Sequence, residues 1–287
     1  YNEGGDVLLA VSAADKRIKD FCMRCLYSEK EDRELSKLFQ EILTNNQIIE
    51  EARPQLMSAF DVDGDFQVVL IKVEGSDNFN AIERRKIAFQ IELCFEKIDS
   101  SYAFFWYDEY FVLIVNNLKE DELKVIINKM HKRSKKRIDD KRVYLGIGSQ
   151  MKDLGQVYLS YKRAKAAVLM AMQFKLPIVF FEDMGVYQIL FSIEDKQILI
   201  EMYHRLLQPL IDYDQKHHGE LEKTLFYYLI YGESQLTMAK NLYMHRNTIN
   251  YRMNKIKELL NCQLDTFEEK VPYILSYYIK KVLEEKK

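Results

Sequence analysis

The sequence lacks the features that mark secreted, fibrous and membrane-spanning proteins. Its 287 residues include 4 cysteines, 4 prolines and 10 glycines, too few for a disulfide scaffold or a low-complexity chain. No apolar run approaches the roughly 18 residues that a membrane span needs. Residues 1–6 carry no basic stretch of the kind that opens a signal peptide. We therefore expect a cytoplasmic protein that has no membrane partner.

An excess of either charge is also absent, since 42 Lys and Arg residues face 44 Asp and Glu residues. This excludes a protein coated in positive charge. It does not exclude a DNA-binding protein, because DNA binding depends on where the cations lie and not on the net charge. Cys22 and Cys25 form a lone C-x-x-C that lacks the second pair or the histidines of a zinc site. His217 and His218 are adjacent, and neighbouring residues on a helix point apart. We expect no metal and no cofactor.

Residues 61–181 show alternating helix and strand patterns. Helical spacing of apolar residues predicts helices, and short β-branched or aromatic runs predict strands. The predicted helices are residues 31–53, ended by Pro54, and residues 79–98, 121–137 and 156–173. The predicted strands are residues 66–73, a hairpin over 102–115, and residues 143–149 and 178–181. This order predicts an α/β domain with split βαβ character.

The strand patterns stop at Ile193. A helix is predicted over residues 193–208, up to Pro209, and a joint at residues 217–219. Everything after the joint is predicted to be helical. We therefore expect four parts: an N-terminal helical segment at 1–60, an α/β domain at 61–192, a helical linker at 193–218 and an all-α domain at 219–287.

Residues 236–260 have the pattern of a helix-turn-helix. Ala239 supplies the small residue that is needed where the two helices cross. Ile249, Met253 and Ile256 recur at helical spacing and predict one buried stripe. The other faces of the second helix carry side chains of the types that contact DNA bases and phosphates: His245, Arg246, Asn247, Thr248, Asn250, Tyr251, Arg252 and Lys255.

The charge of this segment also favours DNA as its partner. Residues 238–257 contain five cations and no Asp or Glu, which is the local footprint that phosphate contact requires. Tyr243 stands in the turn in place of the usual glycine. The alternative is a solvated basic helix packed in a helical domain. A second basic cluster at residues 132–137 is either a solvated helix end or a further DNA contact.

Residues 242–256, L-Y-M-H-R-N-T-I-N-Y-R-M-N-K-I, resemble the helix-turn-helix of the PucR/CdaR family of bacterial transcription regulators. The family pattern is roughly L-x-x-H-R-N-T-hydrophobic-x-Y-R-hydrophobic-x-x-I. The matching residues are His245, Arg246, Asn247, Thr248, Tyr251 and Arg252. Residues 143–167 resemble the family's middle domain, in which G-I-G precedes a helix carrying S-Y-x-x-A-x-x-A. That domain is regarded as a degenerate relative of the diguanylate cyclase (GGDEF) fold, which implies a βαββαβ-type sheet containing antiparallel strands.

The resemblance raises the rival hypothesis of a nucleotide cyclase. The cyclase hairpin carries G-G-D-E-F, and the equivalent residues 106–110 are W-Y-D-E-Y, in which both glycines have become aromatic. A looser alignment puts Lys72 at the cyclases' metal-binding aspartate, with Glu74 two residues on, and a lysine cannot ligate magnesium. We expect Asp108 and Glu109 to form a polar hairpin tip, and the domain to contain no catalytic residues.

The sequence therefore predicts a regulator that binds operator DNA as a homodimer and responds to a small-molecule effector. Arg246 and Asn250 are the expected base contacts. The expected phosphate contacts are His245, Thr248, Tyr251, Arg252 and Lys255. The alternatives are a cyclase-like nucleotide-binding or signalling protein, and a sensor or scaffold that does not bind DNA.

Overall fold

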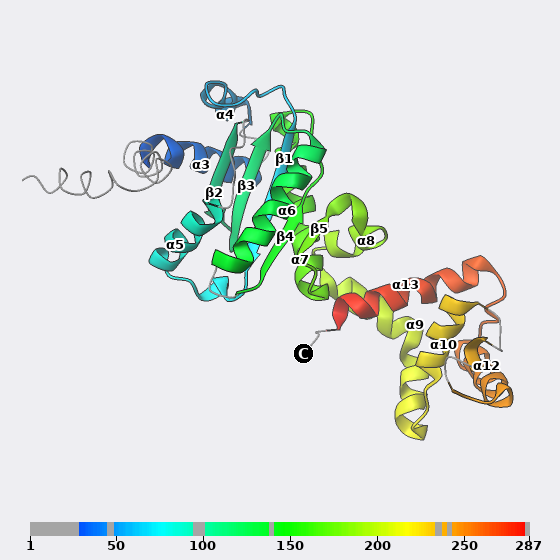
Figure 1. The fold of residues 1–287 in the computed structure, drawn as a ribbon. Helices are drawn as coiled ribbons and strands as arrows, with labels where there is room; N and C mark the ends of the chain where they lie inside the picture. Colours follow the sequence, from blue (N-terminus) through cyan, green and yellow to red (C-terminus); the bar gives the residue numbers. More distant parts are fainter. Residues whose placement is uncertain are drawn as a thin grey trace, which may run out of the picture. The chain divides into compact units, whose positions relative to one another are not determined.

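The computed structural model describes residues 29–44, 49–93, 101–137, 141–232, 237–239 and 243–284, and the C-x-x-C of Cys22 and Cys25 lies outside them. The chain divides into two compact units, Tyr1–Met184 and Gly185–Lys287. The first contains a β-sheet and the second is helical (Figure 1). Across the described ranges, no helix combines the length and the apolar character that a bilayer crossing demands.

A five-stranded sheet in the order β2-β3-β1-β4-β5 organises the first unit. Its strands are β1 (Phe66–Val73), β2 (Tyr102–Tyr107), β3 (Tyr110–Asn116), β4 (Val143–Ile147) and β5 (Ile178–Phe180). The pairs β2–β3, β3–β1 and β1–β4 are antiparallel, and the pair β4–β5 is parallel. The predicted strands, the hairpin and the antiparallel-containing sheet are confirmed.

Helices cover both faces of this sheet, which is why β1 and β3 are buried along their whole lengths. On one face, α5 (Ala81–Glu92) and α6 (Glu120–Arg137) share a core with Val69, Ile71 and Val73 of β1. On the other face, α7 (Val157–Phe174) packs against β1 and β4 (Figure 1). The unit also contains α3 (Glu29–Thr44), α4 (Ile49–Leu56), η3 (Ser76–Asn78), η4 (Leu154–Gln156) and η5 (Phe181–Met184).

Two glycines allow β4 and α7 to approach closely. A Cβ atom on Gly146 would lie 2.2 Å from a backbone nitrogen of α7, and one on Gly148 would lie 2.1 Å from the carbonyl oxygen of Ser160. The Ser160 hydroxyl donates to the carbonyl of Ser149 at 2.7 Å and accepts from the amide of Val68 at 2.9 Å. The G-I-G sequence therefore holds a helix against a strand.

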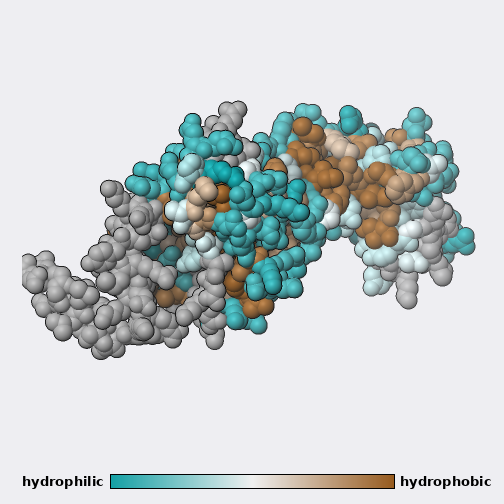
Figure 2. Space-filling view, turned by 90° about the horizontal axis from the view of Figure 1, so that it is seen from above, coloured by the Kyte–Doolittle hydropathy of each residue, from teal (hydrophilic) through white to brown (hydrophobic). Residues whose placement is uncertain are grey.

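The second unit is built from α8 (Tyr187–Ser192), α9 (Lys196–His217), α10 (Leu221–Tyr231), α12 (Arg246–Leu260) and α13 (Phe267–Leu283). Leu207, Leu210 and Ile249 are fully buried in its core. α9, which falls in the segment expected as a linker, packs against α10, α12 and α13. Phe267 and Val271 on α13 remain exposed, and Figure 2 shows apolar surface on this unit.

Two helix ends predicted at prolines are wrong. The expected N-terminal helix is two helices, α3 and α4, and Pro54 lies inside α4. In the second unit, α9 continues past Pro209 and ends at the predicted joint. A proline inside a helix removes its hydrogen bond to the carbonyl four residues earlier. Those carbonyls belong to the exposed residues Glu50 and Arg205, so water can replace the missing donor.

Gly146→Ala tests the close approach of β4 and α7. We expect the free energy of unfolding of the first unit to fall by about 1 to 3 kcal/mol, because a methyl group fits only if the helix moves away from the strand. Urea denaturation measures the change. Equal denaturation midpoints for the variant and the unmodified chain would show that this contact is not tight.

Candidate nucleic-acid interface

A tight turn with a left-handed residue precedes α12. Tyr243 has a φ of 52°, and the residue is 97% exposed. The amide of Met244 donates to the carbonyl of Ala239 at 2.9 Å, which closes the turn. Residues 237–239 are helical, and Met238 is buried in the core of the unit. Helical residues therefore lie on both sides of the left-handed residue Tyr243, as the pattern predicts.

α12 begins at a histidine cap and is anchored by one apolar face. The Nδ1 atom of His245 accepts from the amide of Asn247 at 3.3 Å, which satisfies a donor that has no partner within the helix. Ile249, Met253 and Ile256 are buried, so the predicted stripe is confirmed. α12 contacts α9 and α10. This packing decides which side chains of α12 remain available to a partner.

The predicted contact residues differ in their exposure. His245, Arg246, Asn247, Thr248 and Tyr251 are exposed, and Asn250, Arg252 and Lys255 are half-buried. Asn254 is also exposed, although it is not among the predicted contacts. It lies seven residues after Asn247 and three after Tyr251, so the three share one face. This spacing can be read from the sequence, so Asn254 could have been predicted as a contact residue together with Asn247 and Tyr251.

The charges of α12 divide along its length. No Asp or Glu occurs from residue 243 to residue 257, and the first acid is Glu258. The Lys255 ammonium pairs with Glu258 at 2.9 Å and lies 5.8 Å from the centroid of the Tyr213 ring on α9. A hydrogen bond with Tyr251 raises the pKa of Tyr213. The N-terminal half of α12 is thus free of acids, and the C-terminal half carries paired charges.

Arg252 is held by the start of α10. Its Nη1 atom donates to Glu220 Oε2 at 3.2 Å and to Thr224 Oγ1 at 3.3 Å. The Arg252 side chain is only 18% exposed, and Thr224 is fully buried. Glu220 also pairs with Lys223 at 3.1 Å, and hydrogen bonds from Lys223 and Arg252 lower the pKa of Glu220. The guanidinium therefore belongs to a network between two helices.

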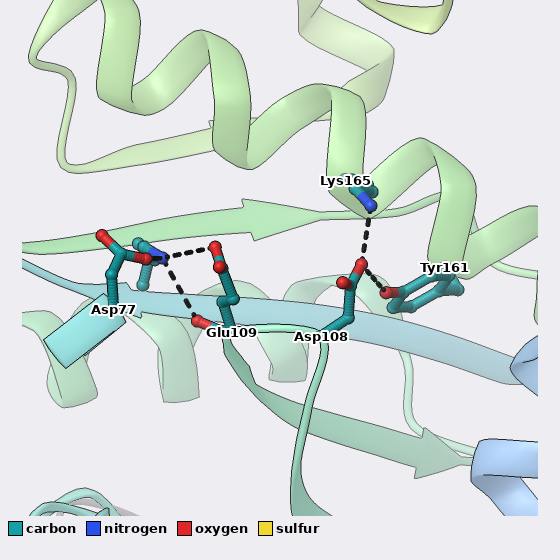
Figure 3. Close-up of polar contacts among 6 residues, drawn as sticks. Asp77, Asp108, Glu109, Tyr161 and Lys165 are labelled. Carbon is teal, nitrogen blue, oxygen red and sulfur yellow. Dashed lines mark hydrogen bonds and ion pairs between the residues drawn. The ribbon is translucent and has the colours of Figure 1, made fainter. Parts of the chain in front are cut away.

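A second polar cluster surrounds the tip of the β2–β3 hairpin (Figure 3). Asp108 and Glu109 have φ angles of 48° and 68°, as a two-residue hairpin turn requires. The carboxylate of Asp108 accepts from the Lys165 ammonium at 2.6 Å and from the Tyr161 hydroxyl at 3.1 Å. Both partners lie on α7. The prediction of a polar hairpin tip is confirmed.

Lys72 on β1 pairs with Glu109, the second residue of the hairpin tip. Its side chain is 5% exposed, and its ammonium pairs with Asp77 and with Glu109, the latter at 3.4 Å (Figure 3). The hydrogen bond from Lys72 lowers the pKa of Asp77, and burial raises the pKa of Tyr110 to about 12. Among the described residues, no three His, Cys, Asp or Glu side chains are grouped to hold a metal. Both tip carboxylates are therefore paired with lysines.

Both units match known protein families. Residues 221–278 match the PucR C-terminal helix-turn-helix domain, a span that covers α10, α12 and most of α13. Residues 56–170 match the GGDEF-like domain, a span that covers β1 to β4 and most of α7.

Similar proteins include three curated regulators. The proline-responsive transcriptional activator PutR of Bacillus subtilis (strain 168) is 32% identical over 143 residues, 48% of this chain and 34% of PutR. The DNA-binding transcriptional activator AdeR of the same organism is 24% identical over 214 residues, 72% of this chain and 49% of AdeR. The carbohydrate diacid regulator of Escherichia coli (strain K12) is 28% identical over 133 residues, 45% of this chain and 34% of that protein. The chain thus matches about a third to a half of each relative's length.

Tyr243→Gly tests the left-handed turn. We expect this variant to be as stable as the unmodified chain or up to about 1 kcal/mol more stable, because glycine adopts a positive φ without strain and the exposed phenol packs on little. Tyr243→Val should be less stable, because a β-branched residue is disfavoured at this φ. Thermal unfolding compares the two. A glycine variant that melts below the valine variant would contradict the turn geometry.

Proposed function

The chain belongs to the PucR/CdaR family of transcription regulators, and from this membership we propose that it binds double-stranded DNA sequence-specifically through α12. The observation that carries the proposal is the exposed, acid-free surface of the N-terminal half of α12. A recognition helix usually points its N-terminal residues at base edges in the major groove. We assign DNA binding to residues 219–287, and α9 supports that part by packing on α12.

The proposed contact residues divide into base contacts and phosphate contacts. Arg246 and Asn250 are the proposed base contacts, since arginine pairs with guanine and asparagine with adenine. Asn254, on the face shared by Asn247 and Tyr251, extends this set. The proposed phosphate contacts are His245, Thr248, Tyr251 and Lys255. Glu258 is exposed and lies on the same helix as Lys255, so a phosphate can replace it as the partner of Lys255 at little cost.

A homodimer on two half-sites is the proposed assembly, because one helix-turn-helix contacts only one half-site. The helical unit exposes apolar side chains that a dimer interface would bury, among them Ile230 on α10 and Phe267 on α13. PutR is named as a proline-responsive activator. We extend to this chain only the class of regulation, in which a small-molecule effector changes DNA binding.

The GGDEF-like domain is proposed to have no catalytic activity. A nucleotide cyclase needs carboxylates free to bind a divalent cation. Here the carboxylate of Asp108 is paired with Lys165, and that of Glu109 is paired with Lys72. Lys72 is buried on the central strand, and a cation placed beside its ammonium would be repelled. This pairing supports a regulatory or structural role for the domain.

Incubation of the purified protein with GTP and magnesium tests this part of the proposal. We expect no cyclic di-GMP, because both tip carboxylates are occupied by lysines. Chromatography of the reaction mixture measures the product against a known active cyclase run in parallel. Product formed in proportion to the concentration of this protein would establish the cyclase alternative.

DNA binding is tested by titrating the protein into a duplex from the region upstream of its own gene, and into an unrelated duplex, at two salt concentrations. We expect tighter binding to the first duplex and a steep loss of affinity with salt, because each phosphate contact releases counterions. Arg246→Ala should lower affinity by about 1 to 3 kcal/mol and relax the preference at one base position.

Arg205→Ala is the matched control for Arg246→Ala. Arg205 is an exposed cation on α9, outside the proposed interface, and its loss should leave both affinities unchanged. Equal weakening of both duplexes by Arg246→Ala would make Arg246 a phosphate contact instead. Failure of the unmodified protein to bind either duplex at low salt would favour the sensor or scaffold alternative.

A further inference from the structure

We propose that Arg252, although it lies on the DNA-binding helix, is a positioning residue that fixes the orientation of α12 and does not contact phosphate. This inference rests on the proposed function, since it assigns a role within the same interface. It departs from the expectation drawn from the sequence, in which Arg252 was one of several phosphate contacts.

The contacts of Arg252 lead to another helix and not to the exposed face of its own. Its Nη1 atom bonds to Glu220 at 3.2 Å and to Thr224 at 3.3 Å, which are both at the start of α10. The Thr224 hydroxyl is fixed in turn, because it donates to the carbonyl of Glu220 at 2.7 Å. A guanidinium with two partners on a neighbouring helix resists the rotation of one helix against the other.

The start of α10, which contacts Arg252, is itself held in place by α9. The Asp214 carboxylate on α9 accepts from the backbone amides of Leu221 at 2.7 Å and Glu222 at 3.0 Å. These amides belong to the first turn of α10, where no carbonyl within the helix can accept from them. Glu220, immediately before them, is therefore anchored to α9 through the backbone. Arg252 consequently ties α12 to a rigid corner formed by α9 and α10.

The position of Arg252 around α12 agrees with this role. It lies three residues after Ile249 and one before Met253, so it flanks the buried stripe. Tyr251 and Asn254 lie on the exposed face of the helix. To reach a phosphate, Arg252 would have to leave both Glu220 and Thr224. Lys255 differs, because its acidic partner Glu258 is exposed and lies on the same helix.

A positioning role has a specific consequence for DNA recognition. If the link to α10 is lost, α12 can tilt or turn about its apolar stripe, and the base-contacting side chains then meet the wrong base edges. Contacts with phosphates tolerate such a change, because phosphates line the whole groove and carry no sequence information. Loss of Arg252 should therefore reduce discrimination between sequences more than it reduces general affinity for DNA.

The test compares Arg252→Ala, Glu220→Gln and the double variant, with Lys255→Ala as the matched variant for a proposed phosphate contact. The probes are the tightest duplex that the unmodified protein selects from a randomised library and a scrambled duplex of equal length. Affinities for both are measured over a range of salt concentrations. Circular dichroism melting identifies a temperature at which every variant is folded.

We expect Arg252→Ala to weaken binding to the selected duplex by about tenfold or more and binding to the scrambled duplex by less than about twofold. The salt dependence should not change. Glu220→Gln should act in the same direction, and the double variant should be no weaker than the weaker single variant, because the two residues act through one link. Lys255→Ala should weaken both duplexes and reduce the slope of log K against log salt by about 0.9.

Three results would overturn the proposal. In the first, Arg252→Ala weakens binding to both duplexes equally and reduces the salt slope as Lys255→Ala does. Arg252 would then be a phosphate contact, and the Glu220→Gln variant would bind both duplexes more tightly. A lower melting temperature without any change in either affinity would make the network purely structural. If the unmodified protein selects no duplex, the proposed function fails, and the role of Arg252 fails with it.

Discussion

The burial of Ile249, Met253 and Ile256 is the constraint on which the proposed interface depends. Fully burying a side chain of this size stabilises a fold by roughly 1.5 to 3 kcal/mol. Turning α12 by one residue, about 100°, would expose this stripe and bury polar side chains in its place. The apolar packing therefore decides that Asn247, Tyr251 and the residues beside them face outward. The packing decides which polar side chains of α12 a partner can reach, whereas the lack of acids follows from composition, since no Asp or Glu occurs from residue 243 to residue 257.

At the hairpin tip of the first unit, the charged side chains are paired with one another. Lys72 is buried on the central strand, and a buried ammonium needs acidic partners to offset its lost hydration. Asp77 and Glu109 supply them, while Asp108 is paired with Lys165. The carboxylates that a metal ion would need are therefore occupied within the protein. In the first unit these charges satisfy one another, whereas the exposed residues in the N-terminal half of α12 include no Asp or Glu.

The parts of the fold that follow from local periodicity were predictable from the sequence. The strands, the hairpin and the buried stripe of α12 each depend on apolar residues at fixed spacing. The helix ends at Pro54 and Pro209 were not, because the cost of a proline depends on whether the carbonyl four residues earlier is exposed. The partner of Arg252 could not be predicted from the sequence either, since Glu220 lies 32 residues away. A motif match places a residue on a helix but does not identify the neighbouring helix that holds it.

Photocrosslinking from α12 to DNA tests the central claim most directly. A photoreactive amino acid at residue 254, on the outward face of α12, is compared with one at residue 205, an exposed position on α9. The proposed interface predicts a crosslink from residue 254 to the duplex that the unmodified protein selects, and none from residue 205. A crosslink from residue 205, with none from residue 254, would contradict the assignment of α12 as the DNA-binding helix.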